Sequence, residues 1–579
     1  MTDGAGVRVA PSARPPLGDR ADGGAPASVT GGRAVVAALA EHGVEVVFGI
    51  PGTHNLEIYR HLPGSGIRVV TPRHEQGAGY AADGYARVTG RPGVVLTTTG
   101  PALLNAATAA GVAYADSVPV LLVSPGMPRS HVPGSGELHE VKDQSGAMAA
   151  ICASSHRVRS VAEIHRVVDD FMAEVRDGRP RPVHLEVPLD VLETPARPAP
   201  RLGVARPPRP APSDDAVRRA AATLVGARSP VIIAGGGARG AAADLVVLAE
   251  LLGAPVLTTA NGKGTVPEHH PLSVGAVLHL AATRELLAAA DVVLAVGTEL
   301  STTDFWAGPP ELPGSLVRVD VDVDQTRRPV IPTHPLVGDA GEVVGRLLAA
   351  ARELTARASS AGRPSGGGPS GGGRNYVPRT IDTLPRPFHD PRVSAIKEES
   401  VRAAARWDHV VPALRRALPD DAVLVGDTSM ACYHGALAEF RVPGPGSFLV
   451  PTGFATLGYA LPAAIGASVG APGRAVAALT GDGAFQFSLT ELATAVEMGL
   501  PLPVVVVDNG GYGVLREEMR ERGITPTGVD LRGPDFVALA GAYGARGVAA
   551  TTAPEVERAV REALEADVPT VVVVPEKVA

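Results

Sequence analysis

The hydrophobic residues of this chain fall into short β-branched runs that alternate with alanine-rich stretches of helical character. In the first third of the chain, such runs lie at 44–49, 94–98, 118–123 and 183–187. Runs that are apolar throughout are typical of parallel strands covered on both faces. Strands that alternate with helices in this way predict doubly wound parallel sheets, the α/β class.

The alternation continues in two further units, separated by segments rich in proline, glycine and serine. Residues 195–212 are rich in proline, and residues 359–374 nearly repeat a Ser-Gly-Gly-Gly sequence. A chain of 579 residues is too long for a single core. We therefore predict a disordered tail at 1–32, α/β domains at 33–195, 213–350 and 405–579, and a flexible linker at 355–400.

In the third unit, two strand patterns end in oxygen-bearing side chains. Gly481-Asp482-Gly483-Ala484-Phe485 precedes a helix expected at 489–499, and the apolar run at 502–507 leads into Asp508-Asn509-Gly510-Gly511-Tyr512-Gly513. Because open α/β sheets bind ligands at the carboxyl ends of their strands, we expect Asp482 and Asn509 to lie close together. Oxygen ligands suit Mg²⁺, and glycine-rich turns suit a diphosphate. A lone Gly-Asp-Gly would indicate only a strand-to-helix corner, but the pair predicts a magnesium–diphosphate anchor.

The segment from Gly481 to Gly513 resembles the signature of thiamine-diphosphate enzymes, in particular the acetolactate synthase and 2-oxo-acid decarboxylase family. The resemblance implies pyrimidine-binding, central and diphosphate-binding domains, and Mg²⁺ bound by Asp482, Asn509 and the Gly511 carbonyl. Asp508 stands where the family often has Asn, one position before the ligand. The resemblance also implies that the cofactor is contacted by Gly481, Asp482, Gly483, Ala484, Asn509, Gly511, Tyr512 and Gly513, and by Thr428 and Ser429 in an earlier turn. Asp427, just before that turn, is expected to cap the following helix.

Glu75 lies where a strand pattern ends and a helix begins, in Arg73-His74-Glu75-Gln76-Gly77-Ala78. Taken alone, it would be a favourable partner for the helix dipole. With Ala82-Asp83-Gly84-Tyr85-Ala86-Arg87, however, the segment resembles that of the cofactor-activating glutamate. The resemblance implies that Glu75 hydrogen-bonds N1′ of the aminopyrimidine in a mostly apolar pocket, so that the imine nitrogen can deprotonate thiazolium C2.

The stretch from Gly453 to Ala464 resembles the family segment that bends the cofactor. The resemblance places Leu457 as a wedge between the two rings and the Ala455 carbonyl against the 4′-amino group. Without the resemblance, we would interpret Leu457 as a core residue. Because Glu75 and the metal site lie in different units, the resemblance implies a homodimer or homotetramer with active sites between chains.

The substrate region departs from acetolactate synthases. Gly126 and Leu138-His139-Glu140 occupy places where those enzymes carry Gln and Phe-Gln-Glu. Residues 51–60 and 135–144 look more like the branch that contains 5-guanidino-2-oxopentanoate decarboxylase. His139 and His54 are candidate proton donors, or else hydrogen-bonded loop residues. The candidate carboxylates for a guanidinium, which are equally read as solvated loop residues, are Glu57, Glu137, Glu140 and Asp143.

The resemblance implies non-oxidative decarboxylation of a 2-oxo acid through a C2 carbanion and an enamine. A candidate substrate is 5-guanidino-2-oxopentanoate. Protonation of the enamine would release an aldehyde, whereas attack on a second carbonyl would give an acyloin, as in acetolactate synthase. The altered residues favour decarboxylation over carboligation.

A flavin or nicotinamide oxidoreductase is the alternative of another class, because Gly235, Gly237 and Gly240 follow a strand pattern with dinucleotide-type spacing. No acidic residue ends a second strand at the expected distance, which weighs against that alternative. Some acetolactate synthases hold FAD without using it, so FAD stays open. A non-catalytic regulator is disfavoured because Glu75, Asp482 and Asn509 are all present.

The composition limits the classes of binding partner that we expect. A net charge of −7 gives no reason to expect nucleic acid or an anionic membrane, and no apolar stretch suits a bilayer. Two cysteines, Cys152 and Cys432, cannot form a disulfide framework. We therefore expect a cytoplasmic enzyme whose partner is a small 2-oxo acid.

Overall fold

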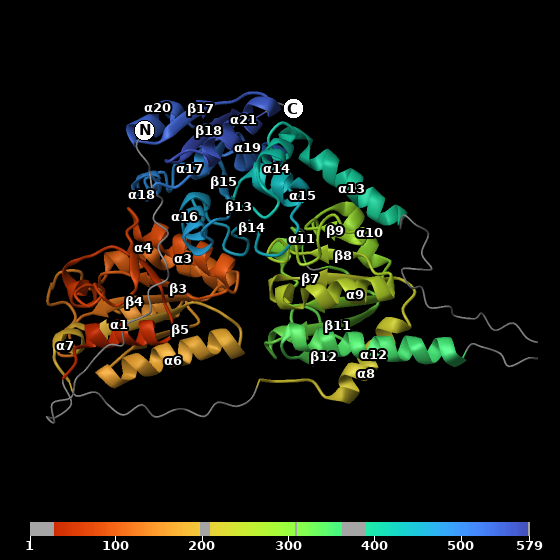
Figure 1. The fold of residues 1–579 in the computed structure, drawn as a ribbon, viewed down its shortest axis with the longest axis horizontal. Helices are drawn as coiled ribbons and strands as arrows, with labels where there is room; N and C mark the ends of the chain where they lie inside the picture. The colour runs from red at the N-terminus through yellow and green to blue at the C-terminus, as the bar shows by residue number, and fades with distance from the viewer. Residues whose placement is uncertain (1–27, 197–208, 307, 309, 362–389, 577–579) are drawn as a thin grey trace, which may run out of the picture.

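Three α/β units make up the protein, with the third unit lying above the first and the central unit, as Figure 1 shows. The computed structural model describes residues 28–196, 209–306, 308, 310–361 and 390–576. Within these ranges each unit contains one six-stranded sheet, and every strand pairing in the three sheets is parallel. The α/β class and the doubly wound parallel sheets are confirmed.

The first unit has the strand order β2-β1-β3-β4-β6-β5. Its strands are β1 (Val46–Gly49), β2 (Arg68–Val70), β3 (Gly93–Leu96), β4 (Val120–Gly126), β5 (Ser154–Arg157) and β6 (Val183–Pro188). Its helices are α1 (Gly31–Glu41), α2 (Leu56–Tyr59), α3 (Glu75–Thr89), α4 (Pro101–Ala115), α5 (Gln144–Ala149), α6 (Val161–Asp177) and α7 (Leu189–Glu193). The central strands are buried along their whole length, as their unbroken apolar sequence predicts.

The central unit has the order β12-β11-β10-β7-β8-β9. Its strands are β7 (Pro230–Ala234), β8 (Val256–Thr258), β9 (Ser273–Gly275), β10 (Val292–Val296), β11 (Ser315–Asp320) and β12 (His334–Val337). Its helices are α8 (Asp214–Val225), α9 (Ala242–Leu252), α10 (Ala281–Ala288), α11 (Thr302–Phe305) and α12 (Ala340–Ala361).

The third unit repeats the order of the first, β14-β13-β15-β16-β18-β17. Its strands are β13 (Val423–Gly426), β14 (Phe448–Leu449), β15 (Val476–Gly481), β16 (Pro503–Asp508), β17 (Arg546–Ala549) and β18 (Thr570–Pro575). Its helices are α13 (Pro391–Ala404), α14 (Val411–Ala417), the π-helix η6 (Ala431–Ala436), α15 (Leu437–Glu439), α16 (Ala460–Gly470), α17 (Asp482–Phe485), α18 (Glu491–Glu497), α19 (Gly513–Glu521), α20 (Phe536–Ala542) and α21 (Ala553–Leu564).

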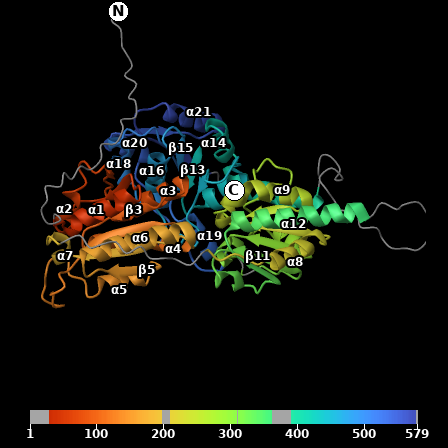
Figure 2. The same ribbon diagram turned by 60° about the horizontal axis from the view of Figure 1, so that its bottom comes forward.

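The units pack tightly where the first meets the third, and Figure 2 shows α3 and α16 side by side. Small residues allow this approach: a Cβ on Gly84 would lie 2.1 Å from the carbonyl oxygen of Ala463, and one on Gly466 1.8 Å from that of Ala81. Close helix packing of this kind fixes the segments at the ends of both helices. These segments contain Glu75 and Leu457.

Two predicted flexible segments are wrong at their ends. Residues 28–32 belong to the first unit, because Val29 pairs with Ala196 and α1 begins at Gly31. The predicted linker at 355–400 overlaps two helices: α12 continues to residue 361, and α13 begins at residue 391. The rest of these segments, residues 1–27 and 362–389, lies outside the described residues.

Among the helices that the structure describes, none has both the length and the hydrophobicity needed to cross a membrane. Cys152 and Cys432 are buried and free.

Candidate active site

The expected metal ligands come together at the edge of the third sheet. β15 and β16 are neighbours with Gly481 opposite Val507, so Asp482 and Asn509 follow adjacent strand ends. The backbone N–H of Asn509 donates to Asp482 Oδ1 at 3.4 Å. The strand-end argument therefore placed these two side chains correctly.

Two oxygen atoms at this edge have no protein partner. Asp482 Oδ2 and Asn509 Oδ1 are buried and accept no hydrogen bond from the described residues. Burial raises the pKa of Asp482, although backbone N–H groups of Asn509, Gly483 and Gly511 oppose the shift. An unpaired carboxylate oxygen inside a protein is costly, and a cation would remove that cost. These oxygens therefore fit Mg²⁺, which prefers oxygen ligands.

The turn that contains Gly511 has a backbone that requires glycine. Gly511 has φ +135°, and a Cβ there would lie 2.2 Å from the Val529 carbonyl oxygen. The turn is held by hydrogen bonds from Tyr512 N to Val529 O and from Leu531 N to Gly510 O, both 2.9 Å. Within the described residues, no cluster of three His, Cys, Asp or Glu side chains is placed to hold a metal. A site with one carboxylate, one amide and one carbonyl would not form such a cluster.

The remaining expected cofactor residues of this motif surround the same edge. Gly483 and Ala484 lie in α17, directly after Gly481, and Gly513 begins α19. The Tyr512 ring lies 3.1 Å from where a Cβ on Gly483 would be, so the two turns are in contact. The two glycine-rich turns thus form one continuous surface.

The loop with Ala455 and Leu457 is fastened from the turn after β13. Thr428 Oγ1 donates to the Thr456 carbonyl at 2.8 Å. Ala455 adopts a left-handed φ of +43°, and Leu457 is half-buried. Ser429 is less available than expected, because its Oγ accepts a hydrogen bond from Cys432 N at 3.3 Å.

The expected role of Asp427 is wrong. Its carboxylate accepts hydrogen bonds from the backbone N–H groups of Gly458 and Ala460, each at 3.0 Å, instead of capping the helix that follows it. Asp427 thus caps α16, far along the chain, and holds the end of the Leu457 loop. Sequence spacing could not reveal a cap that is 33 residues away.

Glu75 opens α3 and is partly exposed in the single chain. Its Oε2 accepts a hydrogen bond from Asn105 Nδ2 at 2.9 Å. The backbone before it is held from the third unit: the N–H groups of Arg73 and His74 donate to the buried carboxylate of Glu491 at 3.0 Å. The described residues of one chain therefore do not enclose Glu75 fully.

His54 and His139, singled out separately in the sequence, lie together. Their ring centroids are 5.4 Å apart, and His54 Nδ1 lies 2.7 Å from Thr99 Oγ1. Burial, followed by the neighbouring His139, lowers the pKa of His54. His139 has a left-handed φ of +64°, and its buried Nδ1 has no hydrogen-bond partner within the part of the chain that the structure describes. Strain and an unsatisfied ring nitrogen together are unusual in a purely structural loop.

The carboxylates suggested for a guanidinium have local partners instead. Glu140 accepts backbone hydrogen bonds from the loop 134–136, and Glu137 pairs with His131. Asp143 caps α5, and Glu57 pairs with Arg60. The solvated-loop alternative therefore describes them better.

A buried polar network joins all three units, and the sequence reasoning missed it. Arg87 donates to Asp83 at 2.6 Å, to Asp116 at 2.7 Å and to Asn261 of the central unit at 2.7 Å. Asp116 also accepts a hydrogen bond from the backbone N–H of Thr452, at 3.1 Å, in the loop before Ala455. The feature of the sequence that could have indicated this network is an aspartate and an arginine four positions apart in α3, a helix that consists mostly of small residues.

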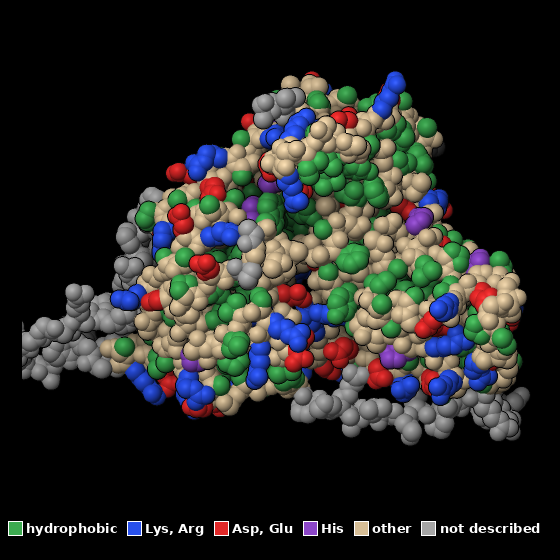
Figure 3. All heavy atoms as spheres, turned by 180° about the vertical axis from the view of Figure 1, so that it is seen from behind, with side chains coloured by type: hydrophobic (Ala, Val, Ile, Leu, Met, Phe, Trp, Pro, Cys, Tyr) green, Lys and Arg blue, Asp and Glu red, His purple; other side chains and the backbone are tan. Residues whose placement is uncertain are grey.

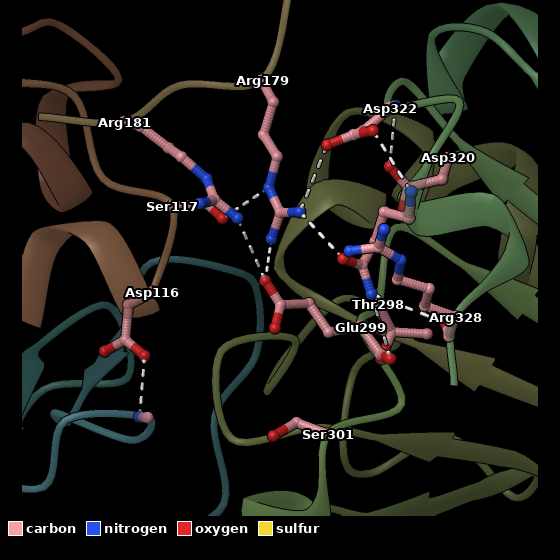
Figure 4. Close-up of polar contacts among 12 residues, drawn as sticks. Asp116, Ser117, Arg179, Arg181, Thr298, Glu299, Ser301, Asp320, Asp322 and Arg328 are labelled. Carbon is pink, nitrogen blue, oxygen red and sulfur yellow. Dashed lines mark hydrogen bonds and ion pairs between the residues drawn. The ribbon is translucent and has the colours of Figure 1, made fainter. Parts of the chain in front are cut away.

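A cavity of about 640 Å³ separates the first unit from the central one. Figure 4 shows Arg179 and Arg181 of the first unit pointing toward Glu299 and Asp322 of the central unit; the Arg179–Asp322 ion pair measures 3.6 Å and the Arg181–Glu299 pair 3.7 Å. The glycines after β7 have a packing role here: a Cβ on Gly235 would lie 2.2 Å from a carbonyl oxygen of the loop after β10. Packing thus accounts for Gly235, whereas a Cβ on Gly240 would meet no atom within 4 Å.

Family models match all three units. They are the N-terminal TPP binding domain of thiamine pyrophosphate enzymes over residues 29–147, the central domain over 217–347 and the C-terminal TPP binding domain over 429–574. The chain belongs to the thiamine pyrophosphate enzyme family. The family assignment makes thiamine diphosphate the cofactor and displaces the oxidoreductase alternative.

Curated relatives are similar in sequence to this chain along most of their length. A probable 2-ketoarginine decarboxylase, AruI, of Pseudomonas aeruginosa is 42% identical over 529 residues, 89% of each chain. A probable acetolactate synthase large subunit of Methanocaldococcus jannaschii is 31% identical over 93% of this chain and 90% of its own. The acetolactate synthase large subunit IlvB1 of Mycobacterium tuberculosis is 34% identical over 90% of this chain and 83% of its own. Thiamine-diphosphate-dependent decarboxylases and acetolactate synthases are therefore both similar to this enzyme.

Proposed function

We propose that the protein is a Mg²⁺- and thiamine-diphosphate-dependent enzyme that decarboxylates a 2-oxo acid and releases an aldehyde. The observation that carries the proposal is the His54–His139 pair, with an unpaired buried Nδ1 on His139. An imidazole can deliver a proton near neutral pH to the carbon that loses carbon dioxide.

Each part of the site has a task in this reaction. When bound, thiamine diphosphate supplies a nucleophilic carbon and accepts the electron pair left by carbon dioxide. Asp482, Asn509 and the Gly511 carbonyl would hold Mg²⁺, on the support of the unpaired side-chain oxygens of Asp482 and Asn509. Glu75 would hold a proton at the aminopyrimidine, and Leu457 would keep the cofactor bent.

The substrate that we propose is 5-guanidino-2-oxopentanoate, also called 2-ketoarginine. The name of the Pseudomonas aeruginosa relative supports it. The first position that differs from acetolactate synthases also favours decarboxylation: a Cβ on Gly126 would lie 2.0 Å from Glu186 Oε1, so a glutamine there would require the buried Glu186 side chain to move.

We further propose a homodimer or a pair of dimers in which Glu75 acts on the cofactor anchored by a second copy. Two features support the proposal. Glu75 is partly exposed, and large hydrophobic residues of the third unit are also exposed, among them Phe454 and Phe487 at 53% each. Figure 3 shows hydrophobic side chains gathered on the third unit above a hollow. A second copy would cover such a surface. A cytoplasmic location is a further proposal, supported by the two free buried cysteines.

The decisive test is product identification. The pure protein, supplied with Mg²⁺ and thiamine diphosphate, is incubated with a panel of 2-oxo acids that includes the guanidino compound and pyruvate. We expect 4-guanidinobutanal and carbon dioxide as the main products, identified by mass spectrometry. Exclusive formation of 2-acetolactate from pyruvate would contradict the proposal and favour the carboligase.

A further inference from the structure

A separate cavity lies between the central and third units, beside the loop that carries Leu457. It has a volume of about 430 Å³, which is ordinary for a small-molecule site. Ala455 forms part of its wall, together with Thr452, and α11, Trp306 and Gly308 also line it. The cavity therefore adjoins the proposed cofactor site.

One wall of this cavity is aromatic. Trp306 stacks on His279 with ring centroids 3.8 Å apart and an interplanar angle of 15°. Tyr433 lies edge-on to the Trp306 ring at 6.3 Å. Trp306 is nevertheless 46% exposed, and it adopts a left-handed φ of +57° at the end of α11. A strained, exposed tryptophan in a cavity offers its ring to a ligand.

Asp304 is the only charged residue among the described residues that line this cavity. It lies two positions before Trp306, and the backbone N–H of Ala260 has a small opposing effect on its pKa. Burial, with a smaller contribution from Asp116, raises the pKa of Asp304 to about 7. A carboxyl in this environment lacks a cation, and a cationic ligand would stabilise its charged form.

His279, which lines the cavity, carries no positive charge that would repel a cation. Burial lowers the pKa of His279 to about 4, so the ring is neutral near pH 7. Burial also lowers the pKa of His434, which packs edge-on against Trp306 at 4.9 Å. The cavity thus combines one acid with neutral aromatic rings.

We propose that this cavity binds the cationic end of the substrate, a guanidinium group, with Asp304 as its counter-charge and Trp306 as its aromatic face. A guanidinium is planar, donates hydrogen bonds to carboxylates and stacks on aromatic rings. The inference rests on the proposed decarboxylation and names the residues that select its substrate. It assigns to Asp304 the role that the loop carboxylates, which have local partners, do not fill.

The test compares two substrates of almost identical shape, 5-guanidino-2-oxopentanoate and 5-ureido-2-oxopentanoate, whose distal ureido group carries no charge. Asp304→Asn is expected to lower the ratio of their kcat/KM values, guanidino over ureido, by roughly 10- to 100-fold, as for loss of a hydrogen-bonded charged partner. The exposed Asp324, whose carboxylate lies outside the cavity, provides the control Asp324→Asn, which should keep the ratio. A ratio unchanged in Asp304→Asn would overturn the inference and leave the decarboxylase intact.

The same ratio should depend on pH. Below pH 7 the Asp304 carboxyl gains a proton, so kcat/KM for the guanidino substrate, relative to the ureido substrate, is expected to fall about tenfold per pH unit. The groups that face Asp304 are Asp116 on one side and His279 and Tyr433 on the other, with Arg87 and Arg239 lining the adjoining cavity. His279 stays neutral between pH 5 and 7, so it does not produce the change. A ratio that is flat over this range would count against Asp304.

A binding measurement separates failure of the inference from failure of the function. The chain has two tryptophans, Trp306 and Trp407, of which Trp407 is 2% exposed. 1-Butylguanidinium should therefore quench the fluorescence of the full-length protein through Trp306, and Trp306→Phe should remove the signal. If no 2-oxo acid is turned over, the proposed function fails, and this titration alone decides the inference: weaker binding in Asp304→Asn supports it, and equal binding overturns it.

Discussion

Replacement of Glu75 by glutamine is expected to lower kcat for 2-oxo-acid decarboxylation by at least about a hundredfold, the usual contribution of a group that transfers a proton. Glutamine keeps the shape and the contact with Asn105, but it cannot share a proton with the cofactor. The backbone around Glu75 is fixed by Glu491 and by the packing of α3 on α16, so the substitution should leave the fold unchanged. A loss of turnover without a loss of stability is the signature of this role.

The measurement is carbon dioxide release under saturating substrate, cofactor and Mg²⁺, together with the thermal midpoint of unfolding. Glu45→Gln is a matched control, because the Glu45 side chain is 58% exposed and pairs only with Arg91 among the described residues. It should retain normal turnover. Near-normal turnover in Glu75→Gln would refute the proposed activation.

Replacement of Arg87 by methionine is expected to lower the thermal midpoint by roughly 5 to 15 °C, corresponding to about 3–5 kcal/mol for a broken buried ion pair. The side chains of Asp83 and Asp116 are fully buried, and both would lose the cation that stabilises them. Asn261 would lose its hydrogen bond from Arg87 as well. Because Asp116 also fastens the loop before Ala455, cofactor affinity should decline with stability.

Differential scanning fluorimetry of both proteins, without and with cofactor, measures the change. Arg91→Met is the control: Arg91 is 43% exposed and its ion pair with Glu45 is at the surface, where such pairs contribute little. An Arg87→Met midpoint equal to that of the control would show that the network does not hold the three units together.

The sequence predicted the three sheets because their central strands are apolar without interruption, a pattern that only fully covered parallel strands produce. It also placed Asp482 and Asn509 side by side, because both directly follow such strands and the strands proved to be neighbours. Local pattern was sufficient wherever a residue's role follows from the strand that it ends.

Residues whose partners lie far along the chain escaped prediction. Asp427 caps a helix that begins at residue 460, and Arg87 reaches Asn261 across a unit boundary. The helix boundaries near the linker were different: Asp390 caps α13 ahead of Pro391, a start signal that the glycine- and serine-rich composition obscured. Contacts between distant residues, the Asp427 cap included, need the fold, whereas the Asp390 cap of α13 is local in the sequence.

The central claim is that Glu75 of one copy and Asp482 of another act on a single cofactor. The most direct test mixes the inactive variants Glu75→Gln and Asp482→Ala, lets their subunits exchange, and then measures activity. Wild-type protein is taken through the same exchange for comparison. Random pairing would give half mixed dimers, each with one intact site, so we expect about a quarter of wild-type activity to return. If the mixture stays as inactive as the separate variants while mixed dimers are shown by mass to form, the two residues do not share a site and the account is wrong.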